Sequence, residues 1–124
     1  MHMEKDYFDD RSYQAIHNSL LEPGDVVYIC TKEAQKYATN IEHLEKGIIV
    51  NKLTSVKKHP RGIKVRIYPI KEGRYPTEEE IAKVLRYYEK NKDEIESEMT
   101  PMILKFRKGR VTYVVDKNNN LIKG

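Results

Sequence analysis

The sequence predicts an α+β fold, in which a small, strongly bent antiparallel sheet is combined with one long helix and a C-terminal β-hairpin. Two observations carry this prediction. Short runs of β-branched and aromatic residues alternate with turn-forming segments, which is typical of strands with short connections. One later stretch instead repeats its apolar residues at helical spacing. We expect residues 1–124 to form a single domain, with a core at residues 22–75 and an extension at residues 76–124.

The first part of the chain predicts a helix, a turn, a strand and a loop. Residues 4–21 predict a short helix, because four apolar side chains recur there at roughly helical spacing. These side chains are Tyr13, Ile16, Leu20 and Leu21. The Pro23-Gly24 pair predicts a turn, since proline presets its φ angle and glycine accepts a positive one. Residues 26–30 predict the first strand, and residues 31–45 predict a polar loop that contains a helical turn.

Two further strands flank a polar connection that is rich in cations. Residues 47–53 predict one strand and residues 63–68 the other. Residues 63–68 alternate strictly, and a period of two places successive side chains on opposite faces. We therefore expect the three apolar members in the core and the two cations exposed. The apolar members are Ile63, Val65 and Ile67, and the other face carries Lys64, Arg66 and Tyr68.

The long helix is predicted at residues 78–99. Thr77 and Glu80 have the spacing of a capping box, in which each side chain accepts a hydrogen bond from the other residue's backbone N–H. Asn91 begins a stretch that weakens the middle, so we expect the helix to bend or restart there. The residues expected to cover one face of the sheet are Ile81, Val84, Leu85 and Tyr88.

The end of the chain predicts a β-hairpin. Its strands are residues 102–106 and 110–115, and its turn is residues 107–109. A second turn at residues 116–120 leads to a short edge strand at residues 121–122.

The net charge of +4 is unevenly distributed along the chain. Residues 46–74 hold nine basic and one acidic side chain, a net of +8, and residues 101–124 have a net of +5. Residues 1–45 and 75–100 have nets of −5 and −4. Such segregation indicates a face that binds a polyanion. Two alternatives stay open, in which the charges only solvate the surface or the basic strands pair with the acidic helix.

The residues that could support catalysis or bind a metal are scattered. The four histidines lie in different predicted elements without the spacing of a helical zinc site, and Cys30 is the only cysteine. No Walker loop and no G-x-G-x-x-G motif occurs. We therefore predict no metal, no cofactor and no catalytic residue. His59 lies among cations that disfavour its protonated form, and it could contact phosphate, act as an acid or base on RNA, or simply be an exposed loop residue.

The candidate nucleic-acid interface combines the cationic connection with the strand that follows it. Its cations would contact phosphates, and the ring of Tyr68 would stack on a base. The alternative for Tyr68 is an amphipathic sheet residue at the core boundary. The predicted binding residues are Lys57, Lys58, His59, Arg61, Lys64, Arg66 and Tyr68.

A family resemblance is carried by residues 47–67, which read GIIVNKLTSVKKHPRGIKVRI. This stretch resembles the core of the YwbE-like family of short uncharacterised proteins, above all in its HP-x-GIKVR string. An upstream Pro-Gly strand start and a downstream Gly-Arg pair extend the resemblance to residues 22–75. It implies a small SH3-like barrel of the sort found in translation and RNA-binding proteins. The chain departs from the family in its longer loop at residues 31–45 and in everything after residue 75.

The leading functional interpretation is non-catalytic binding of nucleic acid in the cytoplasm, with RNA favoured over DNA. The first ten residues are acidic and predict no secretory signal, and no apolar run is long enough for a bilayer. A toxin-type endoribonuclease is one alternative, because those barrels also open with a Pro-Gly-Asp-like strand start, here at residues 23–27. The other alternative is a module that docks a partner protein, or a second copy, through the acidic helix.

Overall fold

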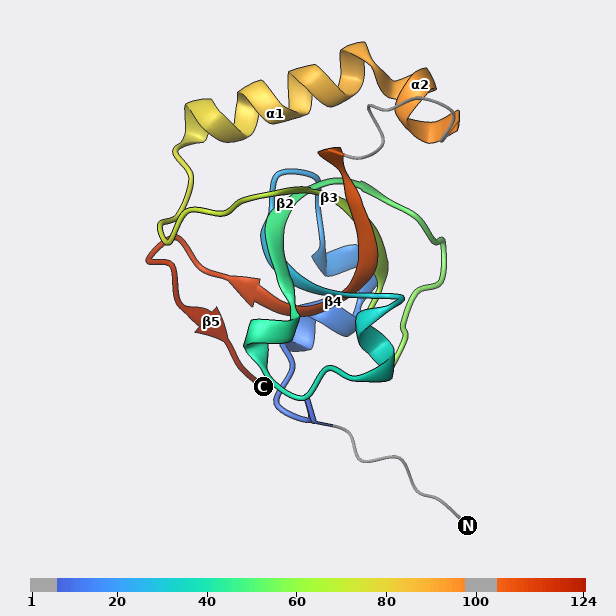
Figure 1. Cartoon of the computed structure of the whole chain (residues 1–124), viewed down its shortest axis with the longest axis vertical. Helices are drawn as coiled ribbons and strands as arrows, with labels where there is room; N and C mark the ends of the chain where they lie inside the picture. The colour runs from blue at the N-terminus through green and yellow to red at the C-terminus, as the bar shows by residue number, and fades with distance from the viewer. Residues whose placement is uncertain (1–6, 98–104) are drawn as a thin grey trace.

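The computed structural model describes residues 7–97 and 105–124, and its secondary structure confirms the α+β class. Strands pair in the order β1-β2-β3-β4-β5, and an additional pairing of β1 with β4 closes the first four into a barrel-like ring (Figure 1). Every pair is antiparallel. The strands are β1 Val26–Thr31, β2 Glu45–Lys52, β3 Lys64–Pro69, β4 Arg107–Val115 and β5 Leu121–Ile122.

The ring encloses the main hydrophobic core. Inward and outward side chains alternate along its strands, because successive residues of a strand point to opposite faces. Ile63, Val65 and Ile67 are each 0% exposed and Lys64 is exposed, as the alternation predicted. The three apolar residues share this core with Ala15, Leu21, Val27, Ile29, Ile49 and Val111.

The turn predicted at residues 107–109 is wrong, whereas the second turn at residues 116–120 and the edge strand at residues 121–122 are confirmed. Residues 107–109, expected as a turn, begin β4, and the hairpin instead joins β4 to β5. Gly109 pairs with Thr31 of β1 and with Val65 of β3. A Cβ on Gly109 would lie 2.5 Å from the carbonyl oxygen of Cys30. This glycine therefore allows two strands to approach closely, which is a use of glycine within a strand, and it does not turn the chain.

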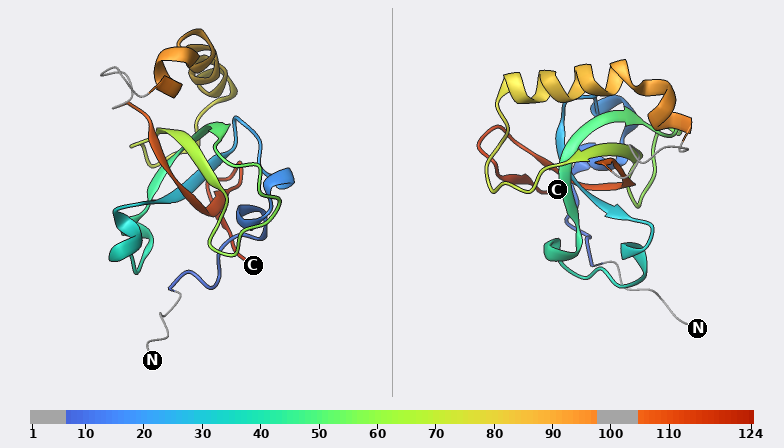
Figure 2. Two further views of the ribbon diagram at one scale, coloured as in Figure 1. Left: turned by 90° about the vertical axis from the view of Figure 1, so that its right-hand side faces the viewer. Right: turned by 45° about the horizontal axis from the view of Figure 1, so that its top comes forward.

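Two consecutive helices, α1 (Glu78–Lys90) and α2 (Lys92–Ser97), lie together on one side of the ring (Figure 2). Both hydrogen bonds of the predicted capping box at Thr77 are present, and the chain restarts its helix after Asn91 as expected. The end of the predicted helix, at residues 98–99, lies outside the described residues. So does most of the strand that was predicted at 102–106.

The apolar stripe of α1 packs on the outside of the ring, as predicted. Tyr88 is 4% exposed and packs with Val50 and Phe106. Ile81 contacts a second cluster that contains Ile48, and the rest of the stripe is half-buried. The part of the ring under α1 and α2 is consequently covered on both faces.

The N-terminal segment does not form the predicted short helix. It contains two 3₁₀ turns, Tyr13–Ile16 and Asn18–Leu20, and both Tyr13 and Leu20 are exposed. The carbonyl of Ala15 accepts a hydrogen bond from the N–H of Ile63 at 2.9 Å, so the segment bonds to the β2–β3 connection. Backbone hydrogen bonds to a segment distant in the sequence take the place of the hydrogen bonds that a helix would have formed within the segment.

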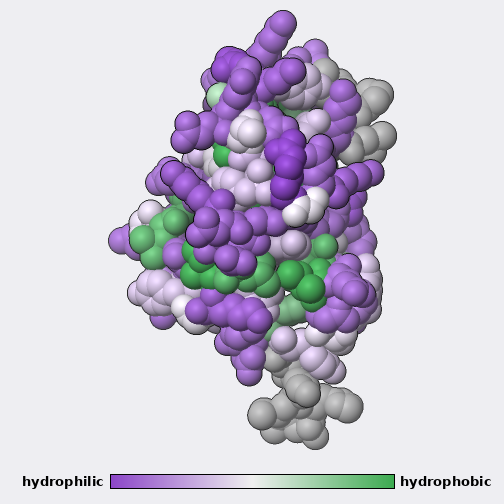
Figure 3. All heavy atoms as spheres, turned by 90° about the vertical axis from the view of Figure 1, so that its left-hand side faces the viewer, coloured by the Kyte–Doolittle hydropathy of each residue, from purple (hydrophilic) through white to green (hydrophobic). Residues whose placement is uncertain are grey.

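The surface of α1 is mainly charged. On the face shown in Figure 3, hydrophilic side chains cover α1, and apolar atoms gather in a band lower on the molecule. Among the described residues, no helix is both long enough and apolar enough to cross a membrane.

Candidate nucleic-acid interface

The structure distributes the seven predicted binding residues over three places. Lys57, Lys58, His59 and Arg61 lie in the connection between β2 and β3, and Lys64 begins β3. The third location is the region under the two helices, where Arg66 and Tyr68 lie.

Arg66 was expected to be exposed, and this expectation is wrong. The residue is only 3% exposed, and its Nη1 donates to the Asn51 side-chain oxygen at 3.3 Å. Its guanidinium also interacts with the phenol of Tyr88, which donates to Glu96 at 2.7 Å. Burial, with the Glu96 hydrogen bond, raises the pKa of Tyr88. The alternation along β3 is correct, but its outward face is exposed only at Lys64, because α1 and α2 cover the part that carries Arg66 and Tyr68.

Tyr68 lies in the same covered region. Its ring meets Phe106 edge-to-face with the centroids 5.7 Å apart, and Val84 and Leu85 belong to the same cluster. The ring is half-buried among apolar side chains. This environment corresponds to the alternative considered for Tyr68, an amphipathic residue at the core boundary.

His59 is half-buried at the turn before β3. Its Nδ1 accepts a hydrogen bond from the N–H of Arg61 at 3.1 Å. Burial lowers the pKa of His59, and the nearby charges of Arg110 and Arg61 lower it further. Of the neighbouring cations that were predicted to disfavour the protonated form, Arg61 does so, but burial is the larger cause and Arg110, distant in the sequence, also contributes.

The sequence did not predict a groove of about 700 Å³ that opens beside this turn. We call it the cationic groove. Its cations are Arg11, Lys32, Lys36, Arg61 and Arg110, and its aromatic side chains are Tyr7, Phe8 and Tyr37. Among the described residues, no aspartate or glutamate lines it. Five side chains that are spread widely over the sequence thus bring positive charge to one concave surface.

The ring fixes two of these cations. Arg11 precedes Ser12, whose N–H donates to the carbonyl of Thr112 in β4 at 3.0 Å. Arg110 lies within β4, and its Nη1 donates to the carbonyl of Gly62 at 3.1 Å. β4 therefore anchors the backbone next to Arg11, and the connection that carries Arg61 holds the guanidinium of Arg110.

The loop after β1 supplies the other wall. The Ala34 N–H donates to Oγ1 of Thr31 at 3.2 Å and starts a 3₁₀ turn at Ala34–Lys36. Lys36 in this turn and Lys32 just before it both line the groove. Charge distribution along the sequence did not single them out, because they lie in a stretch whose net charge is −5.

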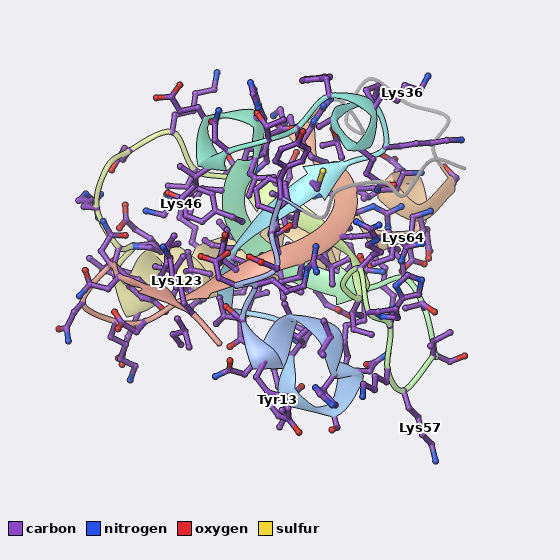
Figure 4. The ribbon with its side chains drawn as sticks, turned by 90° about the horizontal axis from the view of Figure 1, so that it is seen from below. Tyr13, Lys36, Lys46, Lys57, Lys64 and Lys123 are labelled. Atoms are coloured by element: carbon purple, nitrogen blue, oxygen red, sulfur yellow. The ribbon has the colours of Figure 1, made fainter. Side chains whose placement is uncertain are left out.

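A second concave surface continues the first one along β4. The two share Lys32, Gln35 and Arg110, and the second adds Lys64, Arg107 and Lys108 with one acidic residue, Glu33. Arg107 pairs with Glu45 at 3.0 Å, so its charge is partly compensated. Figure 4 shows Lys36 and Lys64 on the same side of the ribbon.

Part of the basic segment at residues 46–74 points elsewhere. Arg74 forms ion pairs with Glu80 at 2.7 Å and with Glu72 at 2.8 Å. Lys46 donates to the side-chain oxygen of Asn119 at 2.7 Å. In Figure 4, Lys46 lies on the side of the molecule opposite Lys36 and Lys64. Position in the sequence is therefore a poor guide to which of these charges act together.

The comparison with family models gives one match. Residues 15–74 match a family described as uncharacterized conserved protein (DUF2196). The match contains β1, β2, β3 and their connections, and it ends before α1. Lys32, Lys36 and Arg61 of the cationic groove lie within it, whereas Arg11 and Arg110 lie outside. Neither the curated proteins nor the solved structures contain a match to the chain.

Proposed function

We propose that this protein binds nucleic acid without catalysis and that the cationic groove is its binding surface. One observation carries the proposal: five cationic side chains converge on a groove whose described lining contains no carboxylate. A nucleic-acid backbone presents regularly spaced phosphates, and a protein binds it mainly by placing Lys and Arg against them. The adjacent surface with Lys64 and Lys108 would extend the contact along the backbone.

We further propose that the closed ring is an SH3-like barrel of the kind that the resemblance to the YwbE-like family implies. Small barrels of this sort occur in translation and RNA-binding proteins, which favours RNA over DNA as the ligand. The helical extension lies over β2 and β3 and leaves the cationic groove uncovered. The proposed basic patch is therefore built around the groove, and of the seven residues predicted from the sequence it keeps Arg61 and Lys64.

The chemistry around His59 favours binding over the endoribonuclease alternative. That alternative needs a carboxylate beside His59 or an arginine in a cleft, and the described lining of the cationic groove offers no carboxylate. The adjoining surface holds Arg107 beside Glu33, but His59 lines neither surface. The Nδ1 atom of His59 already accepts the Arg61 N–H. A neutral imidazole at this position could donate from Nε2 to a phosphate oxygen.

The docking alternative receives less support from the surface of α1. The large apolar side chains that are exposed in the described part of the chain lie on other segments. They are Tyr7, Tyr13, Leu20, Tyr37, Ile41 and Val56.

The test is fluorescence anisotropy with labelled single-stranded RNA at several salt concentrations. Five phosphate contacts predict a log–log slope of affinity against salt of about −3.5. Substituting Lys32, Lys36 and Arg61 with Gln removes three of them and should reduce the slope to about −1.4. The matched control is Lys83→Gln, Lys90→Gln and Lys117→Gln, which removes the same charge from exposed positions outside the groove. No binding at low salt, or equal loss in both variants, would contradict the proposal.

A further inference from the structure

Two exposed aromatic rings stand at the cationic groove. Tyr37 is 59% exposed and Tyr7 is 48% exposed, although both rings line the same surface as the cations. Exposed aromatic side chains that gather at a concave surface together with cations are typical of a binding site, whereas singly exposed rings elsewhere are ordinary. A ligand that suits both kinds of side chain carries phosphates and flat, stackable rings.

The ring of Tyr37 is held in a defined position. Its N–H donates to the carbonyl of Ala34 at 3.0 Å, which places the residue at the end of the 3₁₀ turn. His43 contacts the ring edge-to-face, with the centroids 5.5 Å apart. His43 is itself anchored, because its Nδ1 accepts the Thr39 N–H at 3.0 Å. Stacking a base on the ring would consequently cost little conformational entropy, because the ring is already held in position.

Cations line the same groove as this ring. Lys36 directly precedes Tyr37, and Lys32 lies on the same loop. Arg61 and Arg110 come from the other wall of the groove. A nucleotide with its base on Tyr37 would therefore have cations near the phosphates on both of its sides. The groove, at about 700 Å³, falls in the range of pockets that hold small organic ligands and has room for a short stretch of a strand.

We propose that the cationic groove binds a single strand, with one base stacked on Tyr37 and the neighbouring phosphates on Lys32, Lys36 and Arg61. This inference rests on the proposed function and adds the strandedness of the ligand. In a duplex the bases are stacked inside the helix and present no free face to a tyrosine, whereas a single strand can turn a base outward. Stacking accepts any base, so the site discriminates strandedness much more than sequence.

The experiment compares labelled oligouridine with a duplex RNA of the same length, using the parent protein and Tyr37→Leu. Leucine keeps an apolar side chain but removes the aromatic face. The parent should bind the single strand more tightly than the duplex. Tyr37→Leu should bind oligouridine about five- to 150-fold more weakly, which is the range for one stacked base. Tyr13→Leu is the matched control, because Tyr13 is 56% exposed and lies outside the groove.

Inorganic polyphosphate separates this inference from the proposal on which it rests. Polyphosphate carries the charge but no base, so the parent and Tyr37→Leu should bind it equally. If Tyr37→Leu binds oligouridine as the parent does, while the Lys32, Lys36 and Arg61 variant has lost binding, stacking is refuted and the nucleic-acid proposal stands. Tighter binding of duplex by the parent would likewise refute the single-strand assignment alone. If the parent binds no nucleic acid, both proposals fail.

Discussion

The closure of the ring can be tested at Gly109, where β4 passes between β1 and β3. In Gly109→Ala, the new Cβ would lie 2.5 Å from the carbonyl oxygen of Cys30 and 2.9 Å from its carbonyl carbon. These atoms are backbone, so relief requires the two strands to separate by several tenths of an ångström. Overpacking of this kind typically costs about 1–3 kcal/mol, a large share of the roughly 5–15 kcal/mol that holds a domain folded.

The matched control for this substitution is Gly73→Ala. No atom lies within 4 Å of a Cβ at Gly73, and its φ is not in the left-handed region. The control should therefore change the free energy of unfolding by less than about 0.5 kcal/mol.

Urea unfolding followed by far-UV circular dichroism measures both variants, and their midpoints can be compared at equal slope. A loss of less than about 0.5 kcal/mol in Gly109→Ala would mean that β1 and β4 are not in close contact at this point. The same result would refute close strand approach as the reason for a glycine inside β4.

Three further predictions concern the helix, the histidine and the connection before β3. Leu85→Ala should cost about 1–2 kcal/mol in urea unfolding, less than for a fully buried leucine, because Leu85 is only half-buried between α1 and the ring; a loss near zero would contradict that packing. The lowered pKa of His59 means that the unfolded chain binds its proton first, so stability should fall as the pH decreases through about 6.5. In His59→Gln, the free energy of unfolding measured in urea should fall less between about pH 7.5 and pH 5 than in the parent. A steeper fall in the variant would show that folding does not lower the pKa of His59. Lys57→Gln with Lys58→Gln should change the salt slope for single-stranded RNA by less than about 0.7, the value of one phosphate contact, since neither residue lines the groove; a larger change would move the binding surface to this connection.

Sequence reasoning succeeded where the signal is local. The period-two pattern at Ile63, Val65 and Ile67 identified the inner face of β3, because the pleat of a strand fixes which neighbours share a side. The capping box at Thr77 likewise identified the start of α1 to the residue, since both of its hydrogen bonds lie within four positions of the chain. These features depend on neighbours in the sequence, and no tertiary contact was needed to predict them.

Tertiary structure decided which faces of those elements meet solvent. The same pattern that placed Val65 in the core placed Arg66 on the outer face, but a strand carries no information about what will later pack on that face. The burial of Arg66 results from α1 and α2, which follow it in the chain. Gly109 was predicted as a turn residue for the same reason, because its close approach to Cys30 exists only when β1 and β4 pair.

The cationic groove shows most fully what the sequence alone does not determine. By itself the sequence determined that positive charge is abundant at residues 46–74, and it led to Lys57, Lys58 and Arg66 as binding residues. The groove instead combines Arg61 with cations from the N-terminal segment, the loop after β1, and β4. Side chains separated by up to about one hundred positions become neighbours only when the ring closes, because long-range strand pairing, and not charge content, sets their distance.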